Sequence, residues 1–167
     1  PSRIQLEGIK SINTKKDCIL QSQSGTGKTA TYLLGIYNIL KDDKNTQGIV
    51  ILPTRELAHQ VYTVANTILQ YTDIKVSAGI GGSKYDNMKA NLIICTLGRL
   101  LHMININKIN LKKIRVVAID EADNVLEDKN HLNSNITKLF SKLNDNIQVI
   151  LISATISKII YSFNNKY

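Results

Sequence analysis

The chain has 167 residues, and its 43% hydrophobic content suits one globular domain with an apolar core. A formal net charge of +8 favours a polyanionic partner such as RNA or DNA, although many basic proteins bind no nucleic acid. Aromatic residues make up only 5% of the chain and Trp is absent, which argues against an aromatic platform for base stacking and favours contacts with a nucleic-acid backbone.

The first expected element is a helix at the start of the chain, with Pro1 in its first turn and Ile4, Ile9 and Ile12 on its apolar face. Gln5 lies on the same helix, and its amide carries both the donor and the acceptor that can pair with an adenine edge. Most glutamines on helices are merely solvated, so this residue alone does not establish a nucleotide site.

A glycine-rich turn follows, with the sequence Ser-Gln-Ser-Gly-Thr-Gly-Lys-Thr from Ser22 to Thr29. An apolar run at 18–20 precedes it and a helical pattern at 30–40 follows it, so we expect a strand, a tight turn and a helix. Such a turn directs backbone N–H groups and the positive end of the helix at one spot, which suits a phosphate. We expect Lys28 to reach the β- and γ-phosphates and the Thr29 hydroxyl to reach Mg²⁺. The turn begins with serine where the strict pattern has glycine, and a chance glycine turn is the alternative.

Five more apolar runs of strand length alternate with helical patterns along the rest of the chain. The runs span 48–52, 74–80, 91–95, 115–119 and 148–152, and helices are expected at 54–69, 100–104, 132–143 and 156–167. Thr54 is placed as the N-cap of the first of these helices. Continuous apolar runs are typical of parallel strands that are covered on both faces. We therefore expect an α/β fold with a mainly parallel central β-sheet, helices on both faces and ligands at the carboxyl ends of the strands.

Three carboxylates follow the run at 115–119, in the sequence Asp120-Glu121-Ala122-Asp123. Carboxylates just past a buried strand are costly unless they meet a cation or hydrogen-bond donors. Because the chain also carries a phosphate-binding turn, the natural cation is the Mg²⁺ of a bound nucleotide. The alternative is a helix N-terminus that carries acids because the helix dipole favours them.

Seven short motifs occur in a fixed order along the chain. They span 1–5, 22–29, 53–58, 81–82, 96–99, 120–123 and 153–155. In order and spacing they resemble the Q motif, motifs I and Ia, the glycine doublet, and motifs Ib, II and III of the first RecA-like domain of DEAD-box RNA helicases. The resemblance covers the whole chain and implies one RecA-like P-loop domain over 1–167. Segments 21–31, 46–47 and 80–82 look most like the eukaryotic initiation factor 4A group, which includes its exon-junction relative.

The resemblance implies a role for each motif. The nucleotide would be held by Gln5 at its adenine edge and by Ser24, Gly25, Thr26, Gly27, Lys28 and Thr29 at its phosphates. Catalysis would rest on Lys28, Asp120 and Glu121, with Mg²⁺ held by Thr29 and Asp120 and the attacking water oriented by Glu121. The RNA sugar-phosphate backbone would be held, with little sequence specificity, by Thr54, Arg55, Gly82, Thr96 and Arg99. The two sites would be coupled by Asp123, Ser153 and Thr155. Without the other motifs, Gly81-Gly82 would be an ordinary turn, and Ser153 and Thr155 would be a helix cap.

The resemblance also implies the ATP-binding half of an ATP-dependent RNA helicase, an RNA-stimulated ATPase that clamps RNA and unwinds short duplexes. An RNA clamp or assembly scaffold without useful unwinding is the alternative, and a DNA-directed relative fits the Q motif and 120–123 less well. The second RecA-like domain, which supplies arginine fingers in this family, is absent from 1–167, so we expect weak nucleotide binding and slow or no turnover. Leu97 stands where motif Ib has proline, and losing the fixed φ is expected to loosen the loop that holds Thr96 and Arg99.

The two cysteines, Cys18 and Cys95, lie in apolar runs, and we expect both to be buried, reduced thiols. The sequence holds no Cys/His cluster typical of structural zinc and no apolar run of transmembrane length. We therefore expect an intracellular protein of the cytoplasm or nucleus with no membrane partner. The resemblance adds RNA, a second RecA-like domain and translation-initiation or exon-junction proteins as partners.

Overall fold

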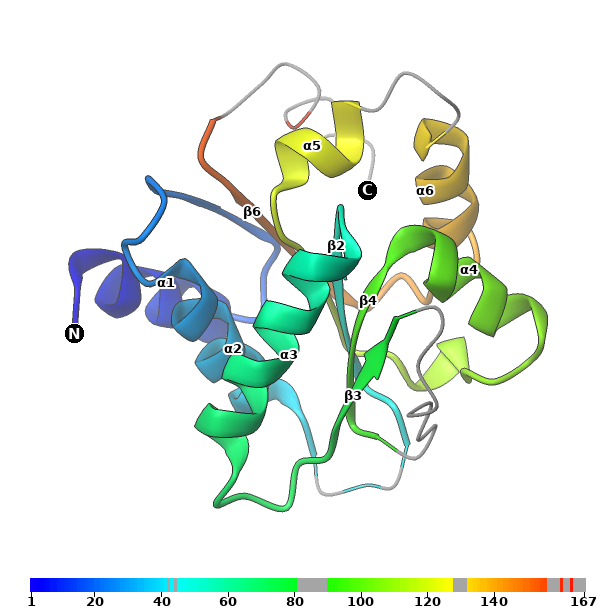
Figure 1. Ribbon diagram of the computed structural model, residues 1–167, viewed down its shortest axis with the longest axis horizontal. Helices are drawn as coiled ribbons and strands as arrows, with labels where there is room; N and C mark the ends of the chain where they lie inside the picture. Colours follow the sequence, from blue (N-terminus) through cyan, green and yellow to red (C-terminus); the bar gives the residue numbers. More distant parts are fainter. Residues whose placement is uncertain are drawn as a thin grey trace.

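Six strands form one sheet in the part of the chain that the computed structural model describes, which is residues 1–41, 43, 45–80, 90–127, 132–155, 160 and 163. The strands are β1 (Cys18–Gln21), β2 (Gly48–Leu52), β3 (Val76–Gly79), β4 (Leu92–Thr96), β5 (Val116–Ile119) and β6 (Gln148–Ser153). Their order is β1-β6-β5-β2-β4-β3, and every neighbouring pair is parallel (Figure 1). The expected parallel α/β fold is confirmed.

Helices cover both faces of this sheet (Figure 1). Successive side chains of a strand point to opposite faces, and all five residues of β2 are buried. Val50 and Leu52 belong to one apolar cluster, which is closed by α1 (Arg3–Asn13), α2 (Lys28–Ile39) and α3 (Arg55–Leu69). Ile49 and Ile51 belong to the other, which is closed by α4 (Leu97–Asn105), α5 (Ala122–Glu127) and α6 (Leu132–Phe140). A short 3₁₀ turn, η1 (Leu111–Lys113), precedes β5.

Several element boundaries differ from the expected ones. Pro1 precedes Ser2, the N-cap of α1, and so lies outside the first turn of that helix. Thr54 caps α3 as expected, because its hydroxyl accepts the Leu57 N–H at 3.2 Å. The helix expected at 132–143 ends at Phe140. Apart from two residues, the tail at 156–167 lies outside the described residues, so the helix expected there is not tested.

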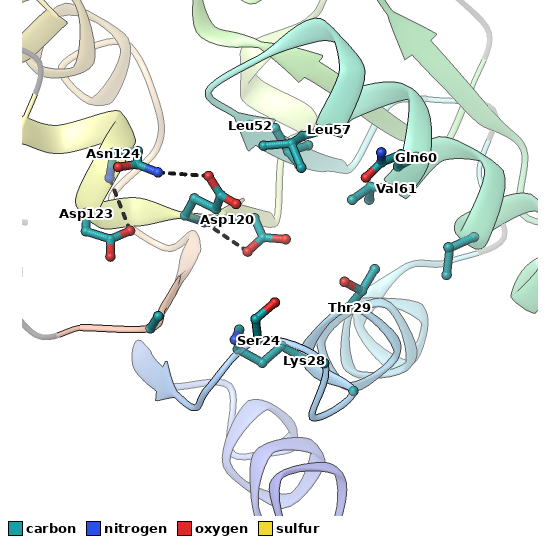
Figure 2. Close-up of a pocket in the computed structure, with 15 residues that line it drawn as sticks. Ser24, Lys28, Thr29, Leu52, Leu57, Gln60, Val61, Asp120, Asp123 and Asn124 are labelled. Atoms are coloured by element: carbon teal, nitrogen blue, oxygen red, sulfur yellow. Dashed lines mark hydrogen bonds between the residues drawn. The ribbon is translucent and has the colours of Figure 1, made fainter.

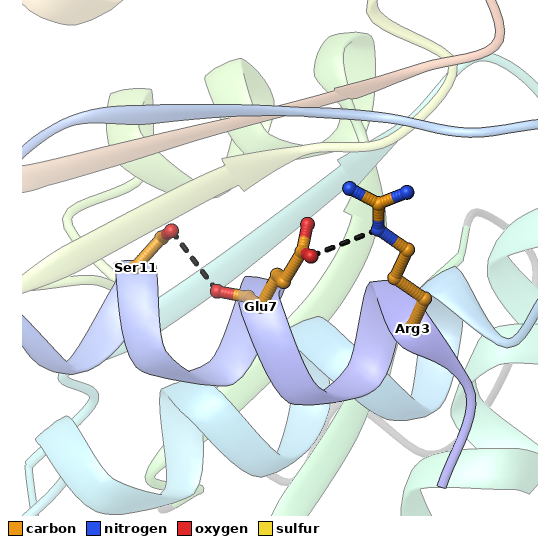
Figure 3. Close-up of polar contacts among 3 residues, drawn as sticks. All are labelled: Arg3, Glu7 and Ser11. Atoms are coloured by element: carbon orange, nitrogen blue, oxygen red, sulfur yellow. Dashed lines mark hydrogen bonds and ion pairs between the residues drawn. The ribbon is translucent and has the colours of Figure 1, made fainter.

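The exposed face of α1 is held by local polar contacts (Figure 3). Arg3 Nε donates to Glu7 Oε1 at 2.8 Å, and the Ser11 hydroxyl donates to the Glu7 carbonyl at 3.0 Å. Because the ion pair is solvent-exposed, it contributes little to stability. The helix is therefore positioned chiefly by its buried face, which includes Ile12.

The expectation of two buried thiols is right for Cys95 and wrong for Cys18. Cys95 is fully buried in β4, which has a neighbouring strand on each side, and burial raises its pKa to about 12. Cys18 lies in β1 at the edge of the sheet and is half-buried, with its pKa raised to about 11 first by burial and then by Asp17. Both thiols are free. Among the described helices, none has the length and apolar character needed to cross a membrane.

Candidate nucleotide site

The glycine-rich turn connects β1 to α2 and has the backbone that only glycine adopts readily. Gly25 has a φ of 78° and Gly27, the N-cap of α2, has a φ of 97°. Both values lie in the left-handed region, where a side chain is disfavoured. The Ser22 hydroxyl, which occupies the place of the usual glycine, lies 2.6 Å from the Thr26 hydroxyl and hydrogen-bonds with it. The serine is therefore accommodated by a contact inside the turn.

Lys28 folds back over this turn. Its Nζ donates to the carbonyl of Ser22 at 2.5 Å and to the carbonyl of Gln23 at 2.7 Å. Neutral carbonyls solvate the ammonium group but carry no countercharge, so an uncompensated positive charge lies beside the turn. Together with the N-terminus of α2, this arrangement suits an anion such as a phosphate.

The N-terminus of α1 is fastened to the same turn. The Ser2 hydroxyl donates to the Thr26 carbonyl at 3.0 Å, and the Ser2 N–H donates to Gln5 Oε1 at 2.9 Å. Gln5 Nε2 lies only 2.8 Å from the position that a Cβ on Gly27 would occupy. Gln5 therefore contacts the turn, although it is not among the described side chains that line the adjacent pocket.

Asp120 follows β5 and faces the turn from the neighbouring part of the sheet (Figure 2). It is 8% exposed, and its two oxygens accept one hydrogen bond each, Oδ1 from the Glu121 N–H and Oδ2 from the Tyr32 hydroxyl, both at 2.9 Å. Burial raises the pKa of Asp120, and these two hydrogen bonds oppose the rise. These two hydrogen bonds thus fix the orientation of the carboxylate at the C-terminal end of a buried strand.

Glu121 has an unusual backbone. Its φ of 48° is left-handed, which is uncommon for a residue with a side chain and is concentrated at functional turns. Its Oε2 accepts the Asn124 side-chain N–H at 2.9 Å. The turn between β5 and α5 therefore holds a second carboxylate in a defined place, beside Asp120.

A pocket of about 510 Å³ separates the glycine-rich turn from these acids (Figure 2). It is lined by Ser24, Gly25, Gly27, Lys28, Thr29, Leu52, Leu57, Gln60, Val61, Val64, Asp120, Glu121, Asp123, Asn124 and Ala154. Its volume is within the range of small-molecule sites, about 300–1,000 Å³. The described residues contain no cluster of three metal-binding side chains of the His, Cys, Asp and Glu types. Thr29 and Asp120 both line this pocket, and their oxygens suit Mg²⁺ that arrives with phosphates, because Mg²⁺ commonly takes only one or two carboxylates from the protein.

The expected coupling residues are in contact. The Thr155 hydroxyl donates to Asp123 Oδ2 at 2.9 Å, and the Thr155 N–H donates to the Ser153 hydroxyl at 3.1 Å. Burial raises the pKa of Asp123, but hydrogen bonding, with the Thr155 hydroxyl first, outweighs burial and lowers the pKa overall. Thr155, which is held by Ser153 at the end of β6, thus contacts the start of α5, which a local helix cap would not do.

The residues expected to bind RNA lie at the ends of two adjacent strands. The register pairs Leu52 of β2 with Thr96 of β4, so the N-termini of α3 and α4 begin at neighbouring points of the sheet edge. Thr54 and Arg55 are exposed there, and Thr96 and Arg99 are half-buried. Gly82 and the rest of its doublet lie outside the described residues.

Leu97 does not lie in a loop. It is the first residue of α4, is only 4% exposed and packs in the apolar cluster on that face of the sheet. Proline suits the first position of a helix, but the buried Leu97 side chain also anchors the start of α4 against the sheet. The expected loop is therefore the start of a helix, and the loosening expected from the missing proline stays a prediction.

The sequence did not identify Tyr32 or Asn124 as site residues. Tyr32 reads as a core residue of an amphipathic helix, and its hydroxyl contact with Asp120 spans 88 residues of sequence. The only sequence signal is its position three residues after Thr29, which puts the two side chains on one helix face. Asn124 follows the acidic motif, and no pattern distinguishes it from a solvated helix residue.

Comparison with known proteins is consistent with this geometry. A family model described as DEAD/DEAH box helicase matches residues 2–163. The ATP-dependent RNA helicase FAL1 of Eremothecium gossypii is 36% identical over 100% of this chain and 44% of its own. Eukaryotic initiation factor 4A of Caenorhabditis elegans is 34% identical over 100% of this chain and 43% of its own. The structure of S. cerevisiae Dbp5 bound to RNA and ADP BeF3 superposes with a TM-score of 0.90 at 31% identity, over 99% of this chain and 44% of that one. The chain thus spans less than half the length of these relatives.

Proposed function

Because the chain belongs to the DEAD/DEAH box helicase family, we propose that it is the ATP-binding RecA-like domain of an RNA-stimulated ATPase that clamps RNA and locally unwinds duplexes. One observation carries this proposal. The glycine-rich turn with Lys28 and Thr29 and the acids Asp120 and Glu121 line the same pocket, although about 90 residues separate them in sequence. A phosphate-binding turn opposite two carboxylates is the arrangement that nucleotide hydrolysis requires.

At the nucleotide, each group has a distinct task. Lys28 would exchange its two carbonyl partners for phosphate oxygens, because a charged acceptor forms the stronger hydrogen bond. Thr29 and Asp120 would hold Mg²⁺, which spreads the negative charge of the phosphates. Glu121, held by Asn124, would orient the attacking water. Gln5 would read the adenine edge from α1.

The RNA would lie along the N-termini of α3 and α4, held at its backbone by Thr54, Arg55, Thr96 and Arg99 and also by Gly82. Helix N-termini and an exposed arginine suit phosphates and carry little base specificity. The contacts among Asp123, Ser153 and Thr155 support a coupling of this surface to the nucleotide pocket, because Asp123 lines that pocket. The structure of Dbp5 bound to RNA and ADP BeF3 supports the pairing of these two ligands.

The complete activity belongs to a longer protein. The relatives named above are more than twice as long as this chain, which supports a second RecA-like domain that supplies arginine fingers and further RNA contacts. Removing an arginine finger lowers such rates by about 10³–10⁵-fold. The 167-residue chain alone therefore turns ATP over slowly or not at all. The longer protein would act inside the cell on RNA, and the name of one relative supports partners from translation initiation.

Calorimetric titration of the chain with ADP in the presence of Mg²⁺ tests the nucleotide site. Lys28→Ala should weaken ADP binding by about tenfold or more, because one charge-assisted hydrogen bond contributes about 1.5–3 kcal/mol. Lys10→Ala is the matched control, since Lys10 is an exposed lysine of α1 that is not among the described pocket-lining residues. Equal ADP affinities of the wild type and Lys28→Ala would contradict the proposal.

A further inference from the structure

Tyr32 is a buried tyrosine whose hydroxyl touches the candidate nucleotide site. It lies on α2 and is fully buried. Its hydroxyl donates to Asp120 Oδ2 at 2.9 Å, while Asp120 Oδ1 accepts the Glu121 N–H at the same distance. Each carboxylate oxygen therefore has one fixed donor, and the donors come from two different elements. The orientation of the carboxylate is set by this pair of contacts.

Thr29 precedes Tyr32 by about one helical turn. The two residues are three apart on α2, so their side chains share one helix face. A tyrosine hydroxyl carries its proton at neutral pH, so it is available as a donor to Asp120.

Resting on the function proposed above, we infer that Tyr32 is a positioning residue for the Mg²⁺ of the bound nucleotide: its hydroxyl fixes the Asp120 carboxylate so that Asp120 and Thr29 present their oxygens to one cation. The role follows from geometry. An ionised carboxylate has about four acceptor sites, and the two contacts described leave lone pairs on both oxygens. Mg²⁺ demands near-ideal octahedral geometry and tolerates a misoriented ligand poorly.

A purely structural role for Tyr32 makes a different prediction. If the hydroxyl only satisfied a buried polar group, its removal would lower the stability of the fold and leave the response to Mg²⁺ unchanged. If the hydroxyl positions Asp120, its removal specifically weakens the ADP binding that depends on Mg²⁺. Loss of a group that orients a residue coordinating the metal directly lowers metal affinity by about 10–100-fold. The quantity that separates the two roles is the ratio of ADP affinities with and without Mg²⁺.

The test measures that ratio by calorimetry for the wild-type chain, Tyr32→Phe and Tyr37→Phe. Tyr37 lies on the same helix but is 40% exposed, so it controls for loss of a hydroxyl from α2. We expect Tyr32→Phe to lower the ratio at least threefold while ADP affinity without Mg²⁺ stays within twofold, and Tyr37→Phe to match the wild type. Thermal unfolding of each variant confirms that it is folded.

A second comparison uses Asp120→Asn as the background. Since Tyr32 acts through Asp120, adding Tyr32→Phe to Asp120→Asn should leave the ratio unchanged. An unchanged ratio in Tyr32→Phe alone, or an equal fall in both backgrounds, would overturn the inference while leaving the proposed function intact. A wild-type chain that binds no ADP at all would overturn the proposed function and this inference with it.

Discussion

Replacing Gly27 with alanine tests how closely the glycine-rich turn is built against α1. Gly27 has a φ of 97°, and a Cβ there would lie 2.8 Å from Gln5 Nε2. Gly25 has a φ of 78° and has nothing within 4 Å of a Cβ, so it is a matched control for backbone strain. The strain alone costs roughly 1–2 kcal/mol in either variant. Gly27→Ala must also displace the Gln5 side chain and its hydrogen bond to the Ser2 N–H, at a further cost of about 1 kcal/mol.

Urea unfolding followed by circular dichroism measures this difference. With a slope of about 1–3 kcal/mol/M, an additional 1 kcal/mol lowers the midpoint by roughly 0.3–1 M relative to Gly25→Ala. Gln5→Ala alone should lower the stability by about 1 kcal/mol, because it removes the hydrogen bond to the Ser2 N–H. Adding Gln5→Ala to Gly27→Ala should cost little more, because that hydrogen bond is already lost. Equal midpoints for the two glycine variants, or fully additive costs of Gln5→Ala and Gly27→Ala, would refute the reasoning.

Three further predictions concern the adenine edge, the RNA surface and the coupling contacts. Gln5→Ala should bind ADP and GDP with equal affinity in a competition titration, whereas the wild type prefers ADP; a retained preference would exclude Gln5 as the adenine reader. Arg55→Ala should weaken binding to single-stranded RNA at low salt and reduce the salt slope by about 0.7, the value for one lost phosphate contact, while Lys10→Ala leaves the slope unchanged. Thr155→Val should lower the melting temperature at pH 7. The pKa of Asp123 is lowered in the folded state, so the stability contributed by its hydrogen bond with Thr155 is present above the ordinary pKa of 3.8 and is lost as the pH falls below that value. The melting temperatures of the wild type and Thr155→Val should therefore converge in acid.

The fold and the positions of most motifs follow from local sequence patterns. A strand such as β2 is a continuous apolar run because both of its faces are covered, and this signal needs no knowledge of its neighbours. The glycine-rich turn is equally local, since Gly25 and Gly27 must supply left-handed backbone within five residues of the helix they precede. Because the strands are parallel, their carboxyl ends meet at one edge, which is why the separate motifs gather there.

What the sequence could not provide depends on contacts between distant segments. Nothing local to Tyr32 reveals a hydroxyl partner 88 residues away, and nothing local to Cys18 reveals that its strand is at the edge of the sheet. The burial of Leu97 is a similar case. The sequence alone does not distinguish a loop from the start of a helix there, because the difference depends on packing against that face of the sheet. The site was thus predictable at the level of motifs, whereas the contacts that orient its side chains were not.

The central claim is that an adenine nucleotide binds between the glycine-rich turn and Asp120. The most direct test is to map amide chemical-shift changes in the ¹⁵N-labelled chain when ADP and Mg²⁺ are added. We expect the largest changes at Gly25, Gly27, Lys28 and Thr29, with smaller ones at Asp120 and Glu121. Changes concentrated instead around the separate pocket lined by 112–115 and 144–146 would contradict the account.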